Sequence, residues 1–127
     1  HEIKINNRMI PVKKFSADVV WLEFDDLCNT PRSTEDFTQI AAFFKTVLIS
    51  NIPLMDSSMD DAARRFINLI DTFYDMHVNI IVSAAESPEK IYSGQRLSFE
   101  FDRAVSRINE MQTDKYIEST HQVIQND

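Results

Sequence analysis

The stretch from Asp60 to Ala84 constrains the fold of this chain more than any other. Its first part repeats apolar residues at helical spacing on one face, and after His77 the pattern changes to a short β-branched run over 78–82. Such a run suits a strand that is covered on both sides. A helix that leads directly into a buried strand predicts an α/β fold. The apolar face of the helix comprises Ala63, Phe66, Ile67, Ile70, Phe73 and Tyr74.

The other segments extend this unit into an alternating pattern of strands and helices. A hairpin over 1–16, with its turn at Asn6-Asn7, precedes everything else. Alternation of strands with helices favours parallel pairing through right-handed crossovers. We therefore expect a single α/β domain over 1–127, with a mainly parallel sheet of about three strands, flanking helices, the N-terminal β-hairpin and a flexible tail over 119–127. The expected strands cover 19–24, 46–49 and 79–83, and a last helix is marked by 101–111.

Local signals indicate where the helices begin. Ser33 and Asp36 have the spacing of a capping box, which predicts a helix start at Ser33. Ser57 or Ser58 is expected to cap the long helix, whose first turn holds two acids that favour the helix dipole. The loop over 55–59 is the segment we expect to be most mobile.

Charge and cysteine content argue against a nucleic-acid-binding protein and against a protein held together by disulfides. The chain has 20 acidic against 13 basic residues and a net charge of −7, which argues against a nucleic-acid-binding surface. Its one cysteine, Cys28, cannot form an internal disulfide, which suits a reducing compartment, and we expect it to be a small buried apolar residue. No apolar run reaches about 18 residues, so no membrane span is expected. The first residue is His1, so we expect the chain to be part of a longer protein.

Glycine content bears directly on nucleotide binding. Gly94 is the one glycine in 127 residues. Phosphate-binding loops need several glycines so that backbone amides can approach the phosphates closely, and neither common loop motif occurs here. By itself the chain is not expected to bind a nucleotide through such a loop.

Two polar features at expected strand ends have two interpretations each. Glu23, Asp25 and Asp26 stand where many nucleotide hydrolases place a metal-holding aspartate and a water-polarising glutamate, but they also suit a solvated strand end. Asn51 stands where a polar residue senses the γ-phosphate in AAA+ ATPases, but it also suits a turn. We favour the strand end and the turn, because no phosphate loop accompanies these residues.

Four arginines are the candidate site residues: Arg64, Arg65, Arg103 and Arg107. Arginine makes bidentate contacts to phosphate or carboxylate, and an arginine inserted into a neighbouring subunit's nucleotide site can stabilise the transition state. The alternative is surface ion pairing with nearby acids, worth under about 1 kcal/mol per pair. No metal site is expected, because His77 and His121 have no partners at ligand spacing, and no cofactor site is expected, because a phosphate loop is missing. The nine phenylalanines are interpreted mostly as core residues, since basic residues do not alternate with them.

Four segments in order resemble one family, the ZapE-like ATPases, also called AFG-type ATPases. They cover most of residues 3–118, and the resemblance implies that the chain is the C-terminal part of such a protein. Ala104 and Phe37 depart from it, since the family pattern often has threonine and tyrosine there. The segments are VVWLEFDDLCNTPRSTEDF (19–37), FKTVLISNIPLM (44–55), DDAARRFINLIDTFYDMHVNIIVSA (60–84) and LSFEFDRAVSRINEMQTDKYI (97–117).

The resemblance implies a P-loop ATPase related to AAA+ proteins, whose phosphate loop and metal-binding strand lie N-terminal to this region. ATP and Mg²⁺ would then act in the full-length protein, whereas these 127 residues alone would be inactive. Arg64, Arg65, Arg103 and Arg107 match arginines of the family pattern, and one of them is the expected nucleotide-contacting or subunit-bridging residue.

The expected partners are the N-terminal ATPase portion of the same protein, further copies in a homo-oligomer, and a protein partner such as the division machinery. Bacterial members of the family are associated with cell division, and mitochondrial members with the inner membrane and with turnover of respiratory-chain proteins. A cytoplasmic bacterial protein is the default expectation, with a mitochondrial location in a eukaryote and peripheral membrane association only through partners. The alternative function is a protein-interaction module without a nucleotide role. A small stand-alone enzyme is a third, weaker alternative, because no nucleophile–base pair is visible.

Overall fold

The stretch from Asp60 to Ala84 folds, in the computed structural model, into helix α3 (Asp60–Asp75) and strand β6 (Asn79–Ala84). The structure describes residues 1–125, with side chains as far as Ser119. His77 takes a positive φ of 58° between the two elements, which turns the chain from the helix into the strand. The predicted helix–strand unit is therefore confirmed.

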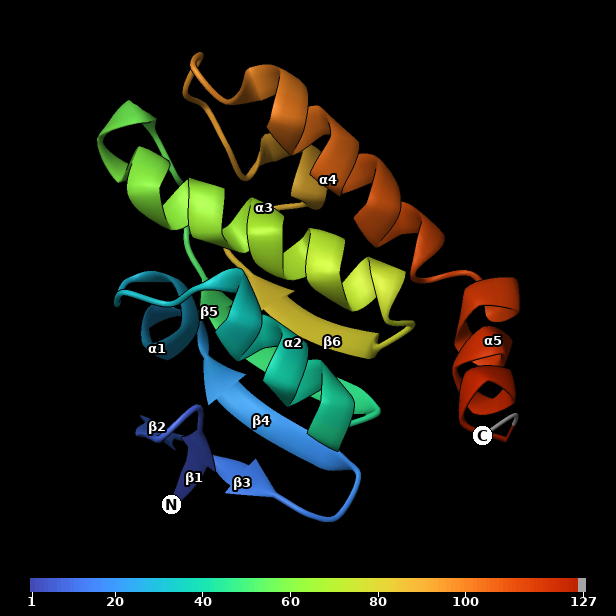
Figure 1. The fold of residues 1–127 in the computed structure, drawn as a ribbon. Helices are drawn as coiled ribbons and strands as arrows, with labels where there is room; N and C mark the ends of the chain where they lie inside the picture. Colours follow the sequence, from blue (N-terminus) through green and yellow to red (C-terminus); the bar gives the residue numbers. More distant parts are fainter. Residues whose placement is uncertain (126–127) are drawn as a thin grey trace.

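The central sheet has four strands in the order β3-β4-β5-β6. Strands β4 (Val19–Glu23), β5 (Thr46–Ile52) and β6 are parallel neighbours, and β3 (Lys14–Phe15) pairs antiparallel with β4. The α/β fold with a mainly parallel sheet is confirmed, with one short strand more than expected (Figure 1).

The N-terminal hairpin consists of β1 (Glu2–Ile5) and β2 (Arg8–Pro11) and forms a separate two-stranded sheet. Asn6 and Asn7 have φ values of 50° and 66°, as the predicted two-residue turn requires. The hairpin ends at Pro11 and does not extend to residue 16, because the chain beyond it joins the main sheet as β3.

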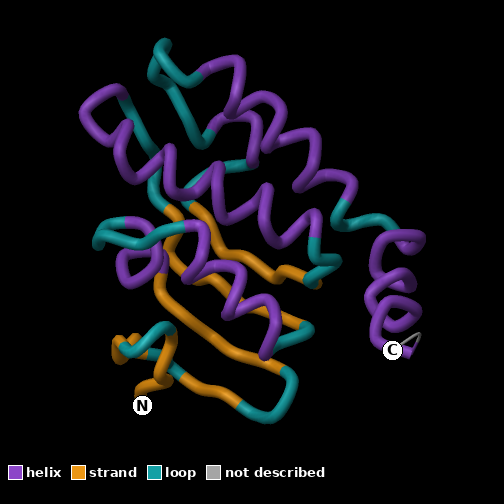
Figure 2. Tube along the Cα trace, in the orientation of Figure 1, coloured by secondary structure: helices purple, strands orange, loops and turns teal. Residues whose placement is uncertain are grey.

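Helices α2 (Thr34–Phe43) and α4 (Ser98–Glu110) occupy the positions that the sequence indicates. Ser33 and Asp36 form the predicted capping box at the start of α2. Helix α1 (Phe24–Cys28) was not expected: its first residue was assigned to the preceding strand. The helix forms because Phe24, Leu27 and Cys28 share one buried face. Figure 2 shows the succession of helices and strands along the chain.

The start of α3 corrects the expectation of a serine cap, while the mobility expected of the loop over 55–59 stays a prediction. The residue before the helix is Met59, which provides no side-chain cap. Ser58 instead lies in the short helix η1 (Ser57–Met59), where its N–H donates to the side chain of the capping residue Asp56. The expected mobile loop over 55–59 is held at its first residue. Met55 is buried, its N–H donates to the carbonyl of Ile91 at 2.8 Å and its carbonyl accepts from Ser93 at 2.8 Å.

The C-terminal region contains a further helix, while the flexibility expected of the tail over 119–127 stays a prediction. Helix α5 (Asp114–Gln125) is formed there, and residues 126 and 127 lie outside the described part. The Tyr116 hydroxyl lies 2.8 Å from the carbonyl oxygen of Val78 and 3.1 Å from that of Phe73. Helix α5 is thus anchored to the turn between α3 and β6, which the apolar content alone did not reveal.

All of the crossover helices lie on one face of the sheet. Because β4, β5 and β6 follow one another both in sequence and in space, two right-handed crossovers place α2 and α3 on the same side (Figure 1). Alternate strand residues such as Val20, Leu22 and Val47 are buried beneath them. Ile81 on β6 is 55% exposed, so the expectation that this strand is covered on both faces is wrong for residues 1–125. No helix in that range is both long and apolar enough to cross a membrane.

Candidate functional site

Three of the four candidate arginines line the seam between α3 and α4. Arg64 lies in the first turns of α3, and Arg103 and Arg107 lie one turn apart on α4. Asp71, in the middle of α3, faces both α4 arginines, and Glu100 faces Arg64. Positions three, four or seven apart on a helix share a face, which is why two helices packed side by side bring these charges together.

Two of the arginines are held by contacts inside the chain. Arg65 is the arginine that does not join the seam: its Nη1 donates to the backbone carbonyl of Cys28 at 3.0 Å and ties α3 to α1. Arg107 pairs with Asp71, and its guanidinium lies 5.0 Å from the ring centre of Tyr74. We interpret both residues as structural, because their donors are already engaged between elements.

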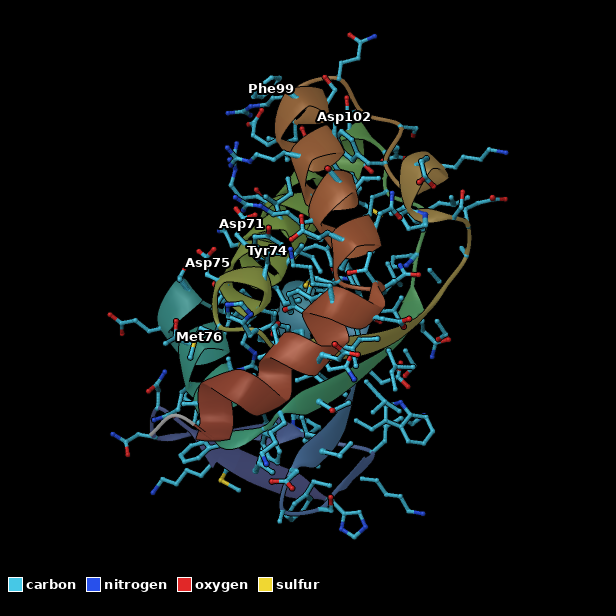
Figure 3. The ribbon with its side chains drawn as sticks, turned by 90° about the vertical axis from the view of Figure 1, so that its right-hand side faces the viewer. Asp71, Tyr74, Asp75, Met76, Phe99 and Asp102 are labelled. Carbon is cyan, nitrogen blue, oxygen red and sulfur yellow. The ribbon has the colours of Figure 1, made fainter. Side chains whose placement is uncertain are left out.

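The other two arginines are accessible. The side chains of Arg64 and Arg103 are 51% and 54% exposed, and each has its nearest carboxylate oxygen at 3.8 Å, on Glu100 and Asp71 respectively. Phe99, one turn before Arg103 on α4, is 76% exposed. Figure 3 shows Phe99 toward one end of α4, on the same side of the molecule as Asp71 and Tyr74 of α3. An exposed aromatic ring one turn from an accessible arginine has the composition of an interaction hot spot.

Asp71 and Phe99 are part of this seam but do not stand out in the sequence. Asp71 lies seven positions after Arg64, a spacing that places both on one face of α3. Phe99 falls outside the apolar stripe of α4 that Phe101, Ala104 and Ile108 form, and that offset was the available signal of exposure. Phe15 and Phe43 are exposed as well, and the other six of the nine phenylalanines are buried, which confirms that these residues lie mostly in the core.

A second polar cluster forms at the carboxyl end of the parallel strands. Glu23, which ends β4, accepts from Lys13 at 2.8 Å and from the side-chain amide of Asn51 at 2.8 Å. These two donors hold the pKa of Glu23 below its ordinary value. Asn51 has a positive φ of 63°, and its N–H donates to the hydroxyl of Ser83 at 3.0 Å. The turn interpretation of Asn51 therefore fits the backbone, while its side chain reaches Glu23. Lys13 was not singled out in the sequence.

The remaining acids do not complete a metal site at this edge. Asp25, in the first turn of α1, accepts from the side chain of Asn29 at 2.6 Å. Asp26 lies in the first turn of α1, and its backbone carbonyl accepts from Arg32 at 2.8 Å. Within the described residues no three His, Cys, Asp or Glu side chains converge as metal ligands. With Glu23 already neutralised by Lys13 and no glycine-rich loop in the chain, these residues do not fit a Mg²⁺-nucleotide on their own.

Cys28 and His77 are held within the structure. Cys28 is buried, as expected, and burial raises the pKa of its thiol to about 12. His77 lies 3.0 Å from the Ser119 hydroxyl through Nδ1 and stacks on Tyr116. The side chain of His121 lies outside the described residues. The contacts of Cys28 and His77 do not indicate catalysis by either residue.

Comparison with known proteins extends the argument beyond the chain itself. A family model described as AFG1-like ATPase matches residues 1–120. The chain is 38% identical over 119 residues to the cell division protein ZapE of Escherichia coli, a match that covers 94% of this chain and 32% of that protein. It is 28% identical to an uncharacterised protein of Schizosaccharomyces pombe and 27% identical to lactation elevated protein 1 homolog B of Danio rerio, covering 93% and 90% of this chain.

The curated relatives are much longer than the region they share with this chain, which spans about a third of their length. No solved structure matches. The family match covers nearly all of the chain, and the α/β fold agrees with the resemblance seen in the sequence. The chain therefore belongs to the AFG1-like ATPase family.

Proposed function

We propose that the full-length protein hydrolyses ATP with Mg²⁺ to remodel a protein partner, and that this region supplies Arg64 or Arg103 to the bound nucleotide. The observation that carries the assignment is the contrast among the four arginines. Arg65 and Arg107 are engaged inside the chain, whereas Arg64 and Arg103 are half exposed and have only long ion pairs at 3.8 Å.

Such long pairs leave the two arginines available to another ligand. An exposed ion pair contributes at most about 1 kcal/mol, so Arg64 and Arg103 can exchange their carboxylate partners for a phosphate at low cost. An arginine that reaches a γ-phosphate in the transition state can raise turnover by about 10³–10⁵-fold. Phe99 would anchor the contact, because aromatic residues dominate the buried centres of protein interfaces.

The nucleotide itself is proposed to bind outside these 127 residues. The AFG1-like relatives have about two thirds of their length beyond the region shared with this chain, which leaves room for a phosphate loop. This arrangement makes the region a contributor to catalysis, acting on a nucleotide of the same protein or of a neighbouring copy in a homo-oligomer.

Alanine substitution of each exposed arginine in the full-length protein tests the proposal. Arg64→Ala or Arg103→Ala is expected to lower kcat for ATP by at least about 100-fold with little change in the unfolding temperature, because the lost interaction acts in the transition state. Lys90→Ala, which removes an exposed cation from the η2 turn (Pro88–Lys90), is the matched control and should leave kcat unchanged.

The structural arginines provide a second comparison. Arg65→Ala and Arg107→Ala should lower stability while the folded protein keeps its turnover, since these side chains hold α1 and α3 in place. Wild-type turnover in both Arg64→Ala and Arg103→Ala would contradict the proposal. If those two variants instead lost partner binding alone, the region would be a protein-interaction module without a nucleotide role.

The cellular role is proposed from the relatives. The Escherichia coli relative is a cell division protein, and we propose that this protein likewise acts on the division machinery in a bacterial cytoplasm. Deleting the gene and counting filamentous cells tests that role, with complementation by the wild type and by Arg103→Ala as the two arms. Normal division in the deletion strain would contradict it.

A further inference from the structure

The face of the sheet opposite the helices carries a continuous apolar row. Trp21 on β4 pairs in register with Leu48 on β5, which pairs with Ile81 on β6. Residues that face one another on adjacent strands lie on the same side of a sheet, so these three side chains form one band across it. Ile81 is more than half exposed, and Trp21 and Leu48 are partly exposed.

The apolar row borders two shallow hollows in the surface. A shallow hollow of about 250 Å³ lies along β3 and β4, and one of about 140 Å³ extends across β4, β5 and β6. Trp21 and Leu48 line both hollows. The Trp21 indole N–H donates to the Ser50 hydroxyl at 2.9 Å, and the Lys13 ammonium lies 5.3 Å from the centre of the Trp21 ring. The indole is thereby held in one orientation.

Parallel sheets occur almost only with both faces covered, because their strands are apolar on both sides. Here the strand order places α2 and α3 on one face, and no helix within residues 1–125 lies over the other face of the sheet (Figures 1 and 3). The relatives are about three times as long as the region they share with this chain. We infer that the Trp21–Leu48–Ile81 row is the surface on which the remaining portion of the full-length protein, the proposed ATPase portion, packs.

The location of the row supports that occupant. The polar cluster of Glu23, Lys13 and Asn51 borders the row at the carboxyl end of the strands, which gives the interface an apolar centre with a charged rim. A band three strands wide suits contacts between domains of one chain, which bury roughly 600–1,500 Å². The row lies on a different side from Arg64 and Arg103, so it can be tested independently of the arginine proposal.

The test compares two variants in two proteins. Ile81→Glu in the full-length protein should lower the unfolding temperature by at least about 4 °C, since it places an unpaired charge in the interface. The same change in the 127-residue chain should have little effect, because Ile81 is exposed there. Met9→Glu, at a residue 52% exposed on the hairpin, is the matched control and should be tolerated in both proteins. Equal small effects of Ile81→Glu in the two proteins would overturn the inference.

A second measurement keeps the inference testable if Ile81→Glu prevents folding. Hydroxyl-radical labelling of wild-type protein should modify Trp21 severalfold more slowly in the full-length protein than in the 127-residue chain, with Met9 as the internal control. Equal labelling of Trp21 in the two proteins would overturn it. So would sedimentation that shows the 127-residue chain to be a dimer and Ile81→Glu to be a monomer, because a second copy would then be the occupant. Loss of turnover in Arg64→Ala bears on neither result.

Discussion

Asp36 shows how one side chain can join distant parts of this chain. It is 1% exposed, accepts from the Asn6 side chain at 3.0 Å and from the Ser33 N–H at 3.0 Å, and pairs with Arg8. Burial raises the pKa of Asp36, but the hydrogen bonds from Asn6, Ser33 and Arg8 outweigh it and hold the pKa below its usual value. The same residue therefore caps α2 and fastens the N-terminal hairpin to it.

Asp36→Asn should destabilise the protein by about 1–3 kcal/mol at pH 7, because it removes the charge that pairs with Arg8. A carboxyl with a lowered folded pKa contributes stability above its unfolded pKa and loses it as the pH falls through the folded pKa. Wild type should therefore lose more stability than the variant between pH 7 and pH 3, as measured by urea unfolding. Glu35→Gln, at the exposed neighbour in the same turn, is the control. Equal pH dependence of wild type and Asp36→Asn would refute the prediction.

Position 94 requires glycine because the Tyr92 side chain lies close to it, and not because the backbone there takes a positive φ. A Cβ at this position would lie 2.3 Å from the Tyr92 hydroxyl oxygen. That hydroxyl donates to Asp60 at 2.7 Å and accepts from the Leu97 N–H at 3.2 Å, and the Tyr92 ring stacks on Phe101, so the tyrosine cannot move aside freely.

Gly94→Ala should cost about 1–3 kcal/mol of unfolding free energy, the typical effect of forcing an extra carbon into a packed site. Urea unfolding of the single variants and of Gly94→Ala combined with Tyr92→Ala measures the coupling between the two sites. In the Tyr92→Ala background the glycine substitution should cost much less. A cost that is the same in both backgrounds would show that the Tyr92 contact is not the cause.

At the scale of elements, the packing of α3 against its neighbours organises the molecule. Its buried face covers the sheet, its arginines meet α4 and α1, and its C-terminal turn receives α5 through Tyr116. Burial raises the pKa of the Tyr116 hydroxyl, which stays protonated and able to donate. Helix α5 thus depends on a contact with a residue 38 positions earlier.

Tyr116→Phe should destabilise the protein by about 1–2 kcal/mol and speed amide hydrogen exchange over 114–119, because it leaves the buried Val78 carbonyl without this donor. Tyr74→Phe is the control: its hydroxyl bonds to Glu110 at the surface, so exchange in α5 should not change. Exchange rates in α5 that are unaffected by Tyr116→Phe would show that the hydroxyl does not anchor the helix.

For the whole molecule, the shared family indicates an ATPase, whereas the sequence of this chain contains no glycine-rich phosphate loop. Isothermal titration of Mg-ATP into the 127-residue chain should therefore detect no micromolar binding, whereas the full-length protein should bind. The reason is physical: phosphate binding needs convergent backbone amides, and this chain has one glycine and a carboxylate already paired with Lys13. Micromolar binding by the 127-residue chain would place the nucleotide site within it.

Much of the fold could be predicted because local patterns determine it. Four sequence signals act within a few residues of one another: the apolar stripe of α3, the β-branched run of β6, the capping box at Ser33 and the asparagine turn at residues 6–7. Helix α1 and strand β3 were not predicted, because each is too short to show a repeating pattern of apolar residues.

The site was less predictable than the fold. The sequence by itself determined that four arginines, a polar strand end and a single glycine were present, because these are matters of residue type and spacing. Only the tertiary structure decided which arginines are engaged and which are accessible, since Asp71, Glu100 and the Cys28 carbonyl come from other turns or other helices. Only strand order placed both crossover helices on one face and left Trp21, Leu48 and Ile81 exposed on the other, because that outcome depends on how distant segments pair.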